Sequence, residues 1–190
     1  INTYPEKPAF LYKKEGKYQS LTYREVGEMI TNLTHGLVSY GIRPGDRLAI
    51  LSNNRPEWPI SDFAIFSLQG VSVPIYQTLP AAQVRYILKD SGARVVFVDN
   101  ELQLKKILEI KKDCPELELI ILFSGSYSNQ TIAWDQILQK GAAHRQKNPD
   151  LYRKNLDSID PKETCSIVYT SGTTGNPKGV MLHHHGFILD

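Results

Sequence analysis

The stretch 48–122 decides the fold of this chain, because it holds four short apolar runs: LAIL at 48–51, VSVPI at 71–75, VVFV at 95–98 and LELIIL at 117–122. The runs are rich in β-branched residues and have the length of single strands. Their apolar residues are nearly continuous instead of alternating with polar ones, which is typical of strands covered on both faces. Four buried strands are therefore expected.

Three sets of apolar residues, spaced by three and four, fill the gaps between these runs, and each set predicts one amphipathic helix. The sets are Ile60, Phe63, Ala64 and Leu68; Val84, Ile87 and Leu88; and Leu104, Ile107 and Leu108. A repeated strand, helix, strand order with right-handed crossovers builds a mostly parallel sheet. The expected fold class is α/β, with a mostly parallel sheet and helices on both of its faces.

The segment before this stretch predicts a hairpin and one more helix. Scattered aromatics up to about Leu21 suit two short edge strands that are joined by a turn at residues 13–17. Thr22 and Glu25 have the spacing of a capping box, and an apolar series at helical spacing follows until Gly41 supplies a stop. That series is Val26, Ile30, Leu33 and Leu37.

The segment after the four runs is more polar. A short helix is expected around Trp134, Ile137 and Leu138. The polar stretch 141–161 is expected to be a surface loop or a linker. A last apolar strand at 167–169 then leads directly into a Gly-rich segment.

Composition limits the classes of function. The chain has 190 residues, 41% of them hydrophobic, and 22 Lys and Arg against 20 Asp and Glu give a formal charge of +2. This balance provides no strong field for nucleic acid or for an anionic membrane. Cys114 and Cys165 have neither metal-ligand spacing nor the density of a disulfide scaffold, so free thiols are expected. Nothing in the sequence indicates an oligomeric state.

Membrane insertion is not expected, because no apolar run approaches the roughly 20 residues of a spanning helix and no signal peptide is evident. A cytoplasmic location is expected, with peripheral contact to the inner face of a membrane left open. Four lysines, Lys105, Lys106, Lys111 and Lys112, are interspersed with acidic residues. They therefore predict a solvated helix face more than a membrane patch.

The segment YTSGTTGNPKG at residues 169–179 carries the strongest chemical signal. From Thr170 to Gly179 it holds three glycines, four hydroxyl side chains and one lysine. Gly172 and Gly175 can take positive φ and let main-chain N–H groups approach phosphate oxygens. The hydroxyls add hydrogen-bond donors, and Lys178 adds a compact positive charge. A phosphate-binding loop explains this composition better than a plain polar hairpin does.

The segment does not fit two familiar nucleotide loops. A P-loop requires Gly-Lys followed by Ser or Thr and a helix. Here Lys178 is followed by Gly179 and by an apolar run at 180–182 that predicts a returning strand. The dinucleotide fingerprint has glycines at its first, third and sixth places, whereas Gly172 and Gly175 are three apart.

These eleven residues resemble the phosphate loop of the adenylate-forming (AMP-binding) superfamily, which includes acyl-CoA synthetases, luciferases and the adenylation domains of peptide synthetases. Upstream, NRPEW at 54–58 and GVSVPIYQT at 70–78 resemble long-chain fatty acyl-CoA synthetases in particular. The resemblance implies the acyl-CoA synthetase/luciferase-like fold over residues 1–190, as an amino-terminal portion without the carboxy-terminal domain. The implied parts are an α/β portion at 1–140, the loop or linker at 141–161, and the phosphate-loop hairpin at 162–190.

The resemblance also implies a chemistry. Such enzymes join a fatty acid to the α-phosphate of ATP with the help of Mg²⁺, release pyrophosphate, and pass the acyl group to the thiol of CoA. Lys178 is the implied catalytic residue, as a cation that stabilises phosphate charge, and Thr170 is the candidate Mg²⁺ ligand. The implied phosphate contacts are Thr170, Ser171, Gly172, Thr173, Thr174, Gly175 and Lys178.

In relatives of this kind most of the active site follows the loop, so the chain by itself is expected to be inactive. Two alternatives stay open. One is a module that binds a nucleotide or phosphate without catalysis. The other is an enzyme that adenylates a different carboxylate, such as an amino acid or an aryl acid.

Two groups of residues near these motifs have ordinary explanations. Residues 183–185 are three consecutive histidines. The side chains of adjacent residues point in different directions, so they do not converge on one ion. A packing or hydrogen-bonding role is expected for His184. Trp58 and Phe63 could line an acyl pocket, but aromatics at helical spacing are usually part of a core.

Overall fold

The computed structural model describes residues 3–126, 128–170 and 176–187. Within them, a seven-stranded sheet has the order β7-β6-β5-β3-β4-β8-β9. All neighbouring strands are parallel except β8 and β9, which are antiparallel. The strands are β3 (Arg47–Leu51), β4 (Val71–Ile75), β5 (Val95–Val98), β6 (Leu119–Leu122), β7 (Ile132–Ala133), β8 (Thr164–Thr170) and β9 (Lys178–His183). The four strands predicted from apolar runs and the mostly parallel sheet are confirmed.

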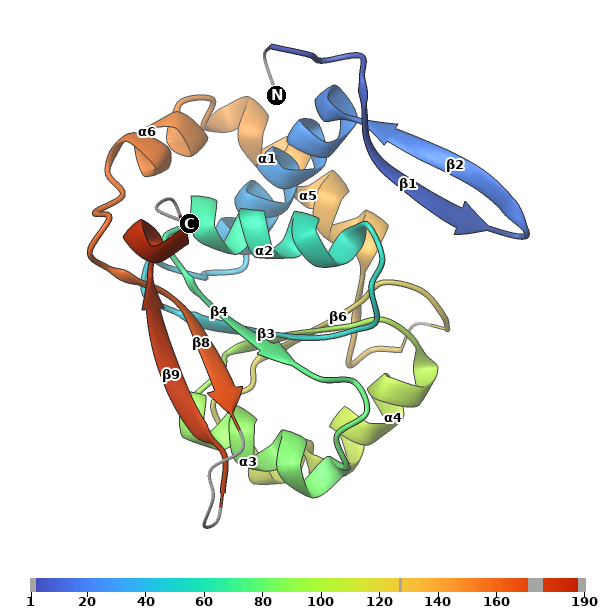
Figure 1. Ribbon diagram of the computed structural model, residues 1–190, viewed down its shortest axis with the longest axis vertical. Coiled ribbons are helices and arrows are strands. Elements are labelled where there is room, and N and C mark those ends of the chain that lie inside the picture. Colours follow the sequence, from blue (N-terminus) through green and yellow to red (C-terminus); the bar gives the residue numbers. More distant parts are fainter. Residues whose placement is uncertain (1–2, 127, 171–175, 188–190) are drawn as a thin grey trace.

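Helices cover both faces of this sheet (Figure 1). One face carries α1 (Tyr23–Ser39), α2 (Glu57–Ser67), α5 (Trp134–Lys147) and α6 (Leu151–Asp157). The other face carries α3 (Ala81–Ser91) and α4 (Glu101–Ile110). Two single turns of 3₁₀ helix, η1 (Lys111–Asp113) and η2 (His184–Phe187), follow α4 and β9.

Two hydrophobic clusters lie on the two faces of the sheet, and consecutive strand residues contribute to different clusters. Ile50 packs with α1, α2 and α5, whereas Leu51 packs with α3 and α4, and both side chains are fully buried. This arrangement explains why the strand runs are apolar at every position, because neither face of the sheet is left to solvent. Cys165 is buried in β8, and both cysteines are free thiols, as expected.

Helix α1 begins at the predicted capping box. The Thr22 hydroxyl accepts from the main-chain N–H of Glu25 (3.2 Å), and the Glu25 carboxylate accepts from the N–H of Thr22 (2.7 Å). Gly41, two residues after the end of the helix, has φ +83°, a conformation that suits glycine. The predicted start and stop of this helix are confirmed.

Helices α1 and α5 cross at two glycines. A Cβ at Gly141 would overlap the main-chain oxygen of Asn32, and a Cβ at Gly36 would lie 2.5 Å from the main-chain oxygen of Ile137. The two backbones therefore approach more closely than any side chain would permit.

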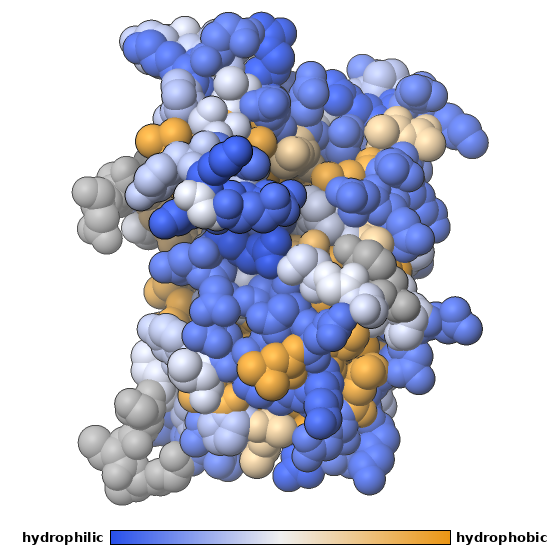
Figure 2. Space-filling view, turned by 90° about the vertical axis from the view of Figure 1, so that its right-hand side faces the viewer, coloured by the Kyte–Doolittle hydropathy of each residue, from blue (hydrophilic) through white to orange (hydrophobic). Residues whose placement is uncertain are grey.

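The first two strands form a separate sheet. β1 (Pro8–Lys14) and β2 (Lys17–Thr22) pair antiparallel with each other, so the predicted hairpin is confirmed. Figure 1 shows this hairpin projecting from one end of the molecule. Figure 2, which looks at the side that carries it, shows a mostly hydrophilic surface on which hydrophobic side chains form only small separate patches.

The prediction of a loop or linker at residues 141–161 is wrong. Helix α5 continues to Lys147, and α6 occupies Leu151–Asp157. Gly141 lies inside α5 and does not end it. Its lack of a side chain allows the close contact with α1. None of the helices in the described ranges is both long and apolar enough to cross a membrane.

Candidate functional site at the carboxyl edge of the sheet

The predicted phosphate segment sits on the hairpin formed by β8 and β9. β8 runs parallel to β4 and ends at Thr170, so it carries this residue to the edge where the parallel strands end. Such carboxyl edges are where ligands bind in open α/β sheets. β9 returns with Tyr169 opposite Gly179 and Thr170 opposite Lys178, which confirms the predicted returning strand.

The structure brings together two of the predicted phosphate contacts. Thr170 and Lys178 are paired across the hairpin, and both are exposed. The other five predicted contacts, Ser171, Gly172, Thr173, Thr174 and Gly175, lie outside the described residues.

Tyr169 connects this hairpin to α3. Its hydroxyl donates to the carboxylate of Asp90 (Oη to Oδ2, 2.6 Å), and its ring meets the ring of Tyr86 edge-on at 6.5 Å between centroids. Burial and the neighbouring Asp90 raise the pKa of Tyr169, so the phenol keeps the proton that it donates. Sequence reasoning missed Asp90, because it is 79 residues from Tyr169 and no local pattern marks it.

The ends of β3 and β5 are joined by a buried acid. Asp99 follows β5 and is 2% exposed. Its Oδ2 accepts from the main-chain N–H of Asn53 (3.1 Å) and from the side-chain amide of Asn53 (2.8 Å). Its Oδ1 is buried and has no hydrogen-bond partner among the described residues.

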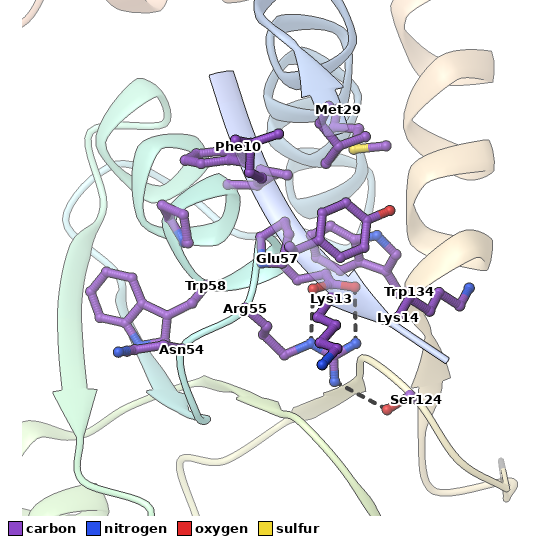
Figure 3. A pocket seen from close by; sticks show the side chains of 16 residues that line it. Phe10, Lys13, Lys14, Met29, Asn54, Arg55, Glu57, Trp58, Ser124 and Trp134 are labelled. Atoms are coloured by element: carbon purple, nitrogen blue, oxygen red, sulfur yellow. Dashed lines mark hydrogen bonds and ion pairs between the residues drawn. The ribbon is translucent and has the colours of Figure 1, made fainter. Parts of the chain in front are cut away.

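Arg55 extends this connection to β6 and α2. Its guanidinium forms a two-pronged ion pair with Glu57 (2.8 and 2.9 Å) and donates to the main-chain oxygen of Asp99 (3.0 Å) and to the hydroxyl of Ser124 (3.1 Å). Figure 3 shows the contacts of Arg55 with Glu57 and Ser124 among the side chains that line a groove. The guanidinium also lies 5.4 Å from the ring centroid of Phe123. Arg55 therefore fixes the positions of three strand ends relative to the start of α2.

The groove above Arg55 has a volume of about 950 Å³ and lies between the β1–β2 hairpin and α2. Apolar side chains from several elements line it, with Lys13 and Lys14 of β1 also present (Figure 3). Trp58 lines the groove and also packs against the core, and the core contact is the one predicted from its helical spacing. The prediction that Phe63 belongs to the core is wrong, because its residue is 52% exposed.

One of the four lysines predicted to form a solvated helix face has a structural role. The Nζ of Lys106 donates to the main-chain oxygens of Gln77 (2.9 Å) and Leu79 (2.7 Å), in the turn that follows β4. Burial lowers the pKa of Lys106, although the nearby Asp99 opposes this effect. Lys105 and Lys112 are exposed, as predicted.

His184, the first residue after β9, acts in packing. The ring of His184 meets the ring of Phe66 edge-on at 5.7 Å, and the main-chain N–H of His184 donates to the oxygen of Glu163 (3.2 Å). This confirms the role expected for His184. In the described parts of the chain, no group of three or more His, Cys, Asp and Glu side chains is placed to hold a metal ion. The Mg²⁺ role of Thr170 stays a prediction.

Comparison with known proteins extends these observations. A long-chain-fatty-acid–CoA ligase of Mycobacterium bovis is 36% identical over 168 residues, which make up 88% of this chain and 27% of the relative. A long-chain-fatty-acid–CoA ligase of Xenopus laevis is 30% identical over 191 residues, which cover 97% of this chain and 25% of the relative. The chain thus spans about a quarter of the length of these curated relatives.

Solved structures share the fold. The anthranilate CoA ligase AuaEII, in complex with anthranoyl-AMP, superposes with a TM-score of 0.78 at 26% identity, over 97% of this chain and 33% of the other. Acetoacetyl-CoA synthetase from Streptomyces lividans has a TM-score of 0.80 at 20% identity, over 98% of this chain and 29% of the other, and shows the fold alone. A family model described as AMP-binding enzyme matches residues 1–189, and the chain therefore belongs to this family of adenylate-forming enzymes.

Proposed function

We propose that this chain is the amino-terminal part of an ATP-dependent acid–CoA ligase whose acid is a long-chain fatty acid. One observation carries the proposal: the β8–β9 hairpin sets Thr170 and Lys178 side by side at the carboxyl edge of the sheet, both exposed. The names of the curated relatives support the substrate class.

The residues of the hairpin stem fit a polyphosphate. Lys178 provides a mobile positive charge, and the hydroxyl of Thr170 can donate to a phosphate oxygen next to it. A cation held at this position offsets the negative charge on the β and γ phosphates and on the departing pyrophosphate. The proposal includes Ser171, Gly172, Thr173, Thr174 and Gly175 as further phosphate contacts.

The reaction has two steps. In the first, an oxygen of the acid carboxylate attacks the α-phosphorus of ATP, and the bond to the β-phosphate breaks to release pyrophosphate. In the second, the thiol of CoA loses its proton and attacks the acyl carbonyl, and AMP leaves. Mg²⁺, when bound to the phosphates, neutralises part of their charge. The 190-residue chain provides only the phosphate end of this site, so we propose that it is inactive alone.

The phosphate-binding step can be tested on the chain itself. We expect Lys178→Ala to weaken the binding of inorganic pyrophosphate by at least about fivefold, measured by isothermal titration calorimetry, because a charge-assisted contact is lost. Lys17→Ala removes an exposed lysine from the β1–β2 hairpin and is the matched control. Equal losses in the two variants would mean that pyrophosphate responds only to net charge, and would contradict the assignment of Lys178.

The substrate class requires the protein that the complete reading frame encodes. We expect AMP release to need CoA and to increase with the chain length of the fatty acid. Anthranilate is the informative competitor, because one solved neighbour at 26% identity is an anthranilate CoA ligase. Preference for anthranilate would replace the fatty acid with an aryl acid, and turnover without CoA would refute the ligase assignment. For the chain alone, ATP–pyrophosphate exchange above that of Lys178→Ala would refute inactivity.

A further inference from the structure

The strand that carries the phosphate loop pairs with β4 near its start, several residues before the loop. The ladder between β4 and β8 consists of the single pair Ser72 and Ser166. β8 continues for four more residues to Thr170, and its other neighbour, β9, is the outermost strand. The end of β8 therefore lies beyond its pair with β4, with β9 as its hydrogen-bonded neighbour.

Helix α3 supports the part of β8 that lies beyond this pair. Ile167 and Tyr169 both pack against the hydrophobic cluster under α3 and α4. Beyond that cluster, the Tyr169 hydroxyl reaches Asp90 at 2.6 Å, and the Tyr86 ring stands perpendicular to the Tyr169 ring, with an interplanar angle of 89°. Figure 1 shows the hairpin passing beside α3. Tyr169 is the last residue of β8 before Thr170, so this contact fixes the stem of the loop directly.

Gly179 allows Tyr169 to take this position. It lies opposite Tyr169 in the hairpin, and a Cβ added there would lie 2.7 Å from Cγ2 of Ile167 and 3.2 Å from Cζ of Tyr169. Any larger residue would displace the Ile167 side chain and would also crowd the Tyr169 ring. The absence of a side chain at Gly179 therefore lets the Tyr169 ring lie across the returning strand.

The alternation of side chains along a strand connects this contact to the phosphate contacts. Tyr169 and Gly179 face α3, so their neighbours Thr170 and Lys178 face the opposite side of the hairpin. A rotation of the stem about its own axis would move both sets of residues together. Holding the Tyr169 ring thus also determines the direction in which Thr170 and Lys178 are presented.

We propose that Tyr169 and Asp90 are positioning residues of the phosphate loop: their hydrogen bond, with Gly179 beneath the ring, locks the loop stem onto α3 and orients Thr170 and Lys178. The proposal rests on the proposed function of the loop. Neither residue touches substrate. Their role is to reduce the conformational freedom that a bound phosphate would otherwise have to restrict.

Hydrogen exchange tests the lock without any ligand. Tyr169→Phe keeps the ring and removes only the hydroxyl. We expect the main-chain amides of Asn176 and of residues 178–180 to exchange about threefold to tenfold faster, because an exposed charge-assisted hydrogen bond contributes little more than this. The amides of β3 and β5 should not change. Tyr12→Phe, which removes a hydroxyl bonded to Gln19 in the distant hairpin (2.9 Å), is the matched control. Unchanged exchange at Asn176 and 178–180, or faster exchange throughout the sheet, would overturn the proposal.

Pyrophosphate affinity provides the second measurement. Tyr169→Phe and Asp90→Ala should each weaken binding to the 190-residue chain by about threefold to tenfold, and the double variant should be no worse than either. Asp90→Asn keeps an acceptor oxygen but loses the charge, so its affinity should lie between those of Asp90→Ala and the wild type. Additive losses would overturn the pairing. If the wild type does not bind pyrophosphate, the proposed function fails, whereas the exchange experiment still decides whether Tyr169 and Asp90 hold the stem.

Discussion

The rings of His35 and His144 meet between α1 and α5, with their Nδ1 atoms 3.0 Å apart. One of these nitrogens must donate and the other accept, so the contact requires at least one neutral ring. His35 is fully buried, and its Nε2 has no partner in the described residues. Burial, with the nearby His144 and Arg145, lowers the pKa of His35 to about 4.

Replacing His35 should therefore change how stability depends on pH. Between pH 6.5 and about 4 the unfolded chain binds a proton that the folded chain does not. The contribution of His35 is fully present above pH 6.5 and is lost as the pH falls. From about pH 7 to about pH 4.5, we expect the free energy of unfolding to fall by about 2 kcal/mol more in the wild type than in His35→Gln.

Urea unfolding followed by tryptophan fluorescence would measure this difference. His183→Gln is the matched control, because His183 is exposed. A wild type and a His35→Gln variant with parallel pH profiles would show that the buried ring does not control the acid side of the curve.

Asp62 should have the opposite effect. It lies on α2, and burial raises its pKa to about 6, while the neighbouring Ser72 hydroxyl lowers it by less. The contribution of this carboxyl is present below pH 3.8 and is lost as the pH rises through 6. We expect Asp62→Asn to raise the free energy of unfolding at pH 7 by about 1 to 2 kcal/mol, with a smaller gain at pH 4.5.

The same urea series tests this prediction, with Asp157→Asn, an exposed acid on α6, as the control. Because the titrations of Asp62 and His35 overlap with opposite signs, their effects should nearly cancel in the wild type. The pH dependence of the free energy of unfolding should then be set by His35 in Asp62→Asn and by Asp62 in His35→Gln. A gain in stability that is equal at both pH values would contradict the assigned pKa of Asp62.

Arg55→Lys should destabilise the fold. A lysine cannot reproduce the fork that contacts Glu57, Asp99 and Ser124 together. We expect a loss of about 1 to 3 kcal/mol in the free energy of unfolding. Arg85→Lys provides the comparison, since its ion pair with Asp113 is substantially exposed and should lose less than about 0.5 kcal/mol. Similar losses in both variants would mean that the contacts of Arg55 add no more stability than an exposed ion pair does.

Gly141→Ala should be more harmful than its position in a polar helix suggests. The added methyl group would overlap the main-chain oxygen of Asn32, and a backbone cannot rotate away as a side chain does. We expect a loss of roughly 3 kcal/mol or more, measured by thermal or urea unfolding. Gly186→Ala, where nothing lies within 4 Å of the added Cβ, should be nearly neutral. A stable Gly141→Ala protein would show that α1 and α5 can separate slightly at little cost.

The strands could be predicted from the sequence because burial on both faces leaves a simple pattern, as in the run Val95–Val98. The second half of α5 could not be predicted from the sequence. Its last turns are polar, and Gly141 resembles a stop signal until the contact with α1 is known. Phe63 fits the helical spacing of its neighbours but lies beyond the edge of the buried face.

The candidate site also has parts that could be predicted from the sequence and parts that could not. The hairpin that carries Thr170 and Lys178 was predicted, because a strand, a Gly-rich turn and a returning strand are consecutive in the chain. The contacts that hold this hairpin in place were not predicted. Asp90 reaches Tyr169, and Lys106 reaches the turn after β4, only because the crossover helices return to the same sheet. Such pairs depend on topology and leave no local signature.

The single pair between β4 and β8 also has a consequence during protein synthesis. Ser72 meets its partner Ser166 only after about 90 more residues have been made, or roughly 5 to 20 seconds of translation. Until then, β4 is an open edge that could pair with another nascent chain. Pro74 lies within this strand and has no N–H to offer such a partner. With Pro74 in β4, that edge has one hydrogen-bond donor fewer to offer before the β8–β9 hairpin has been made.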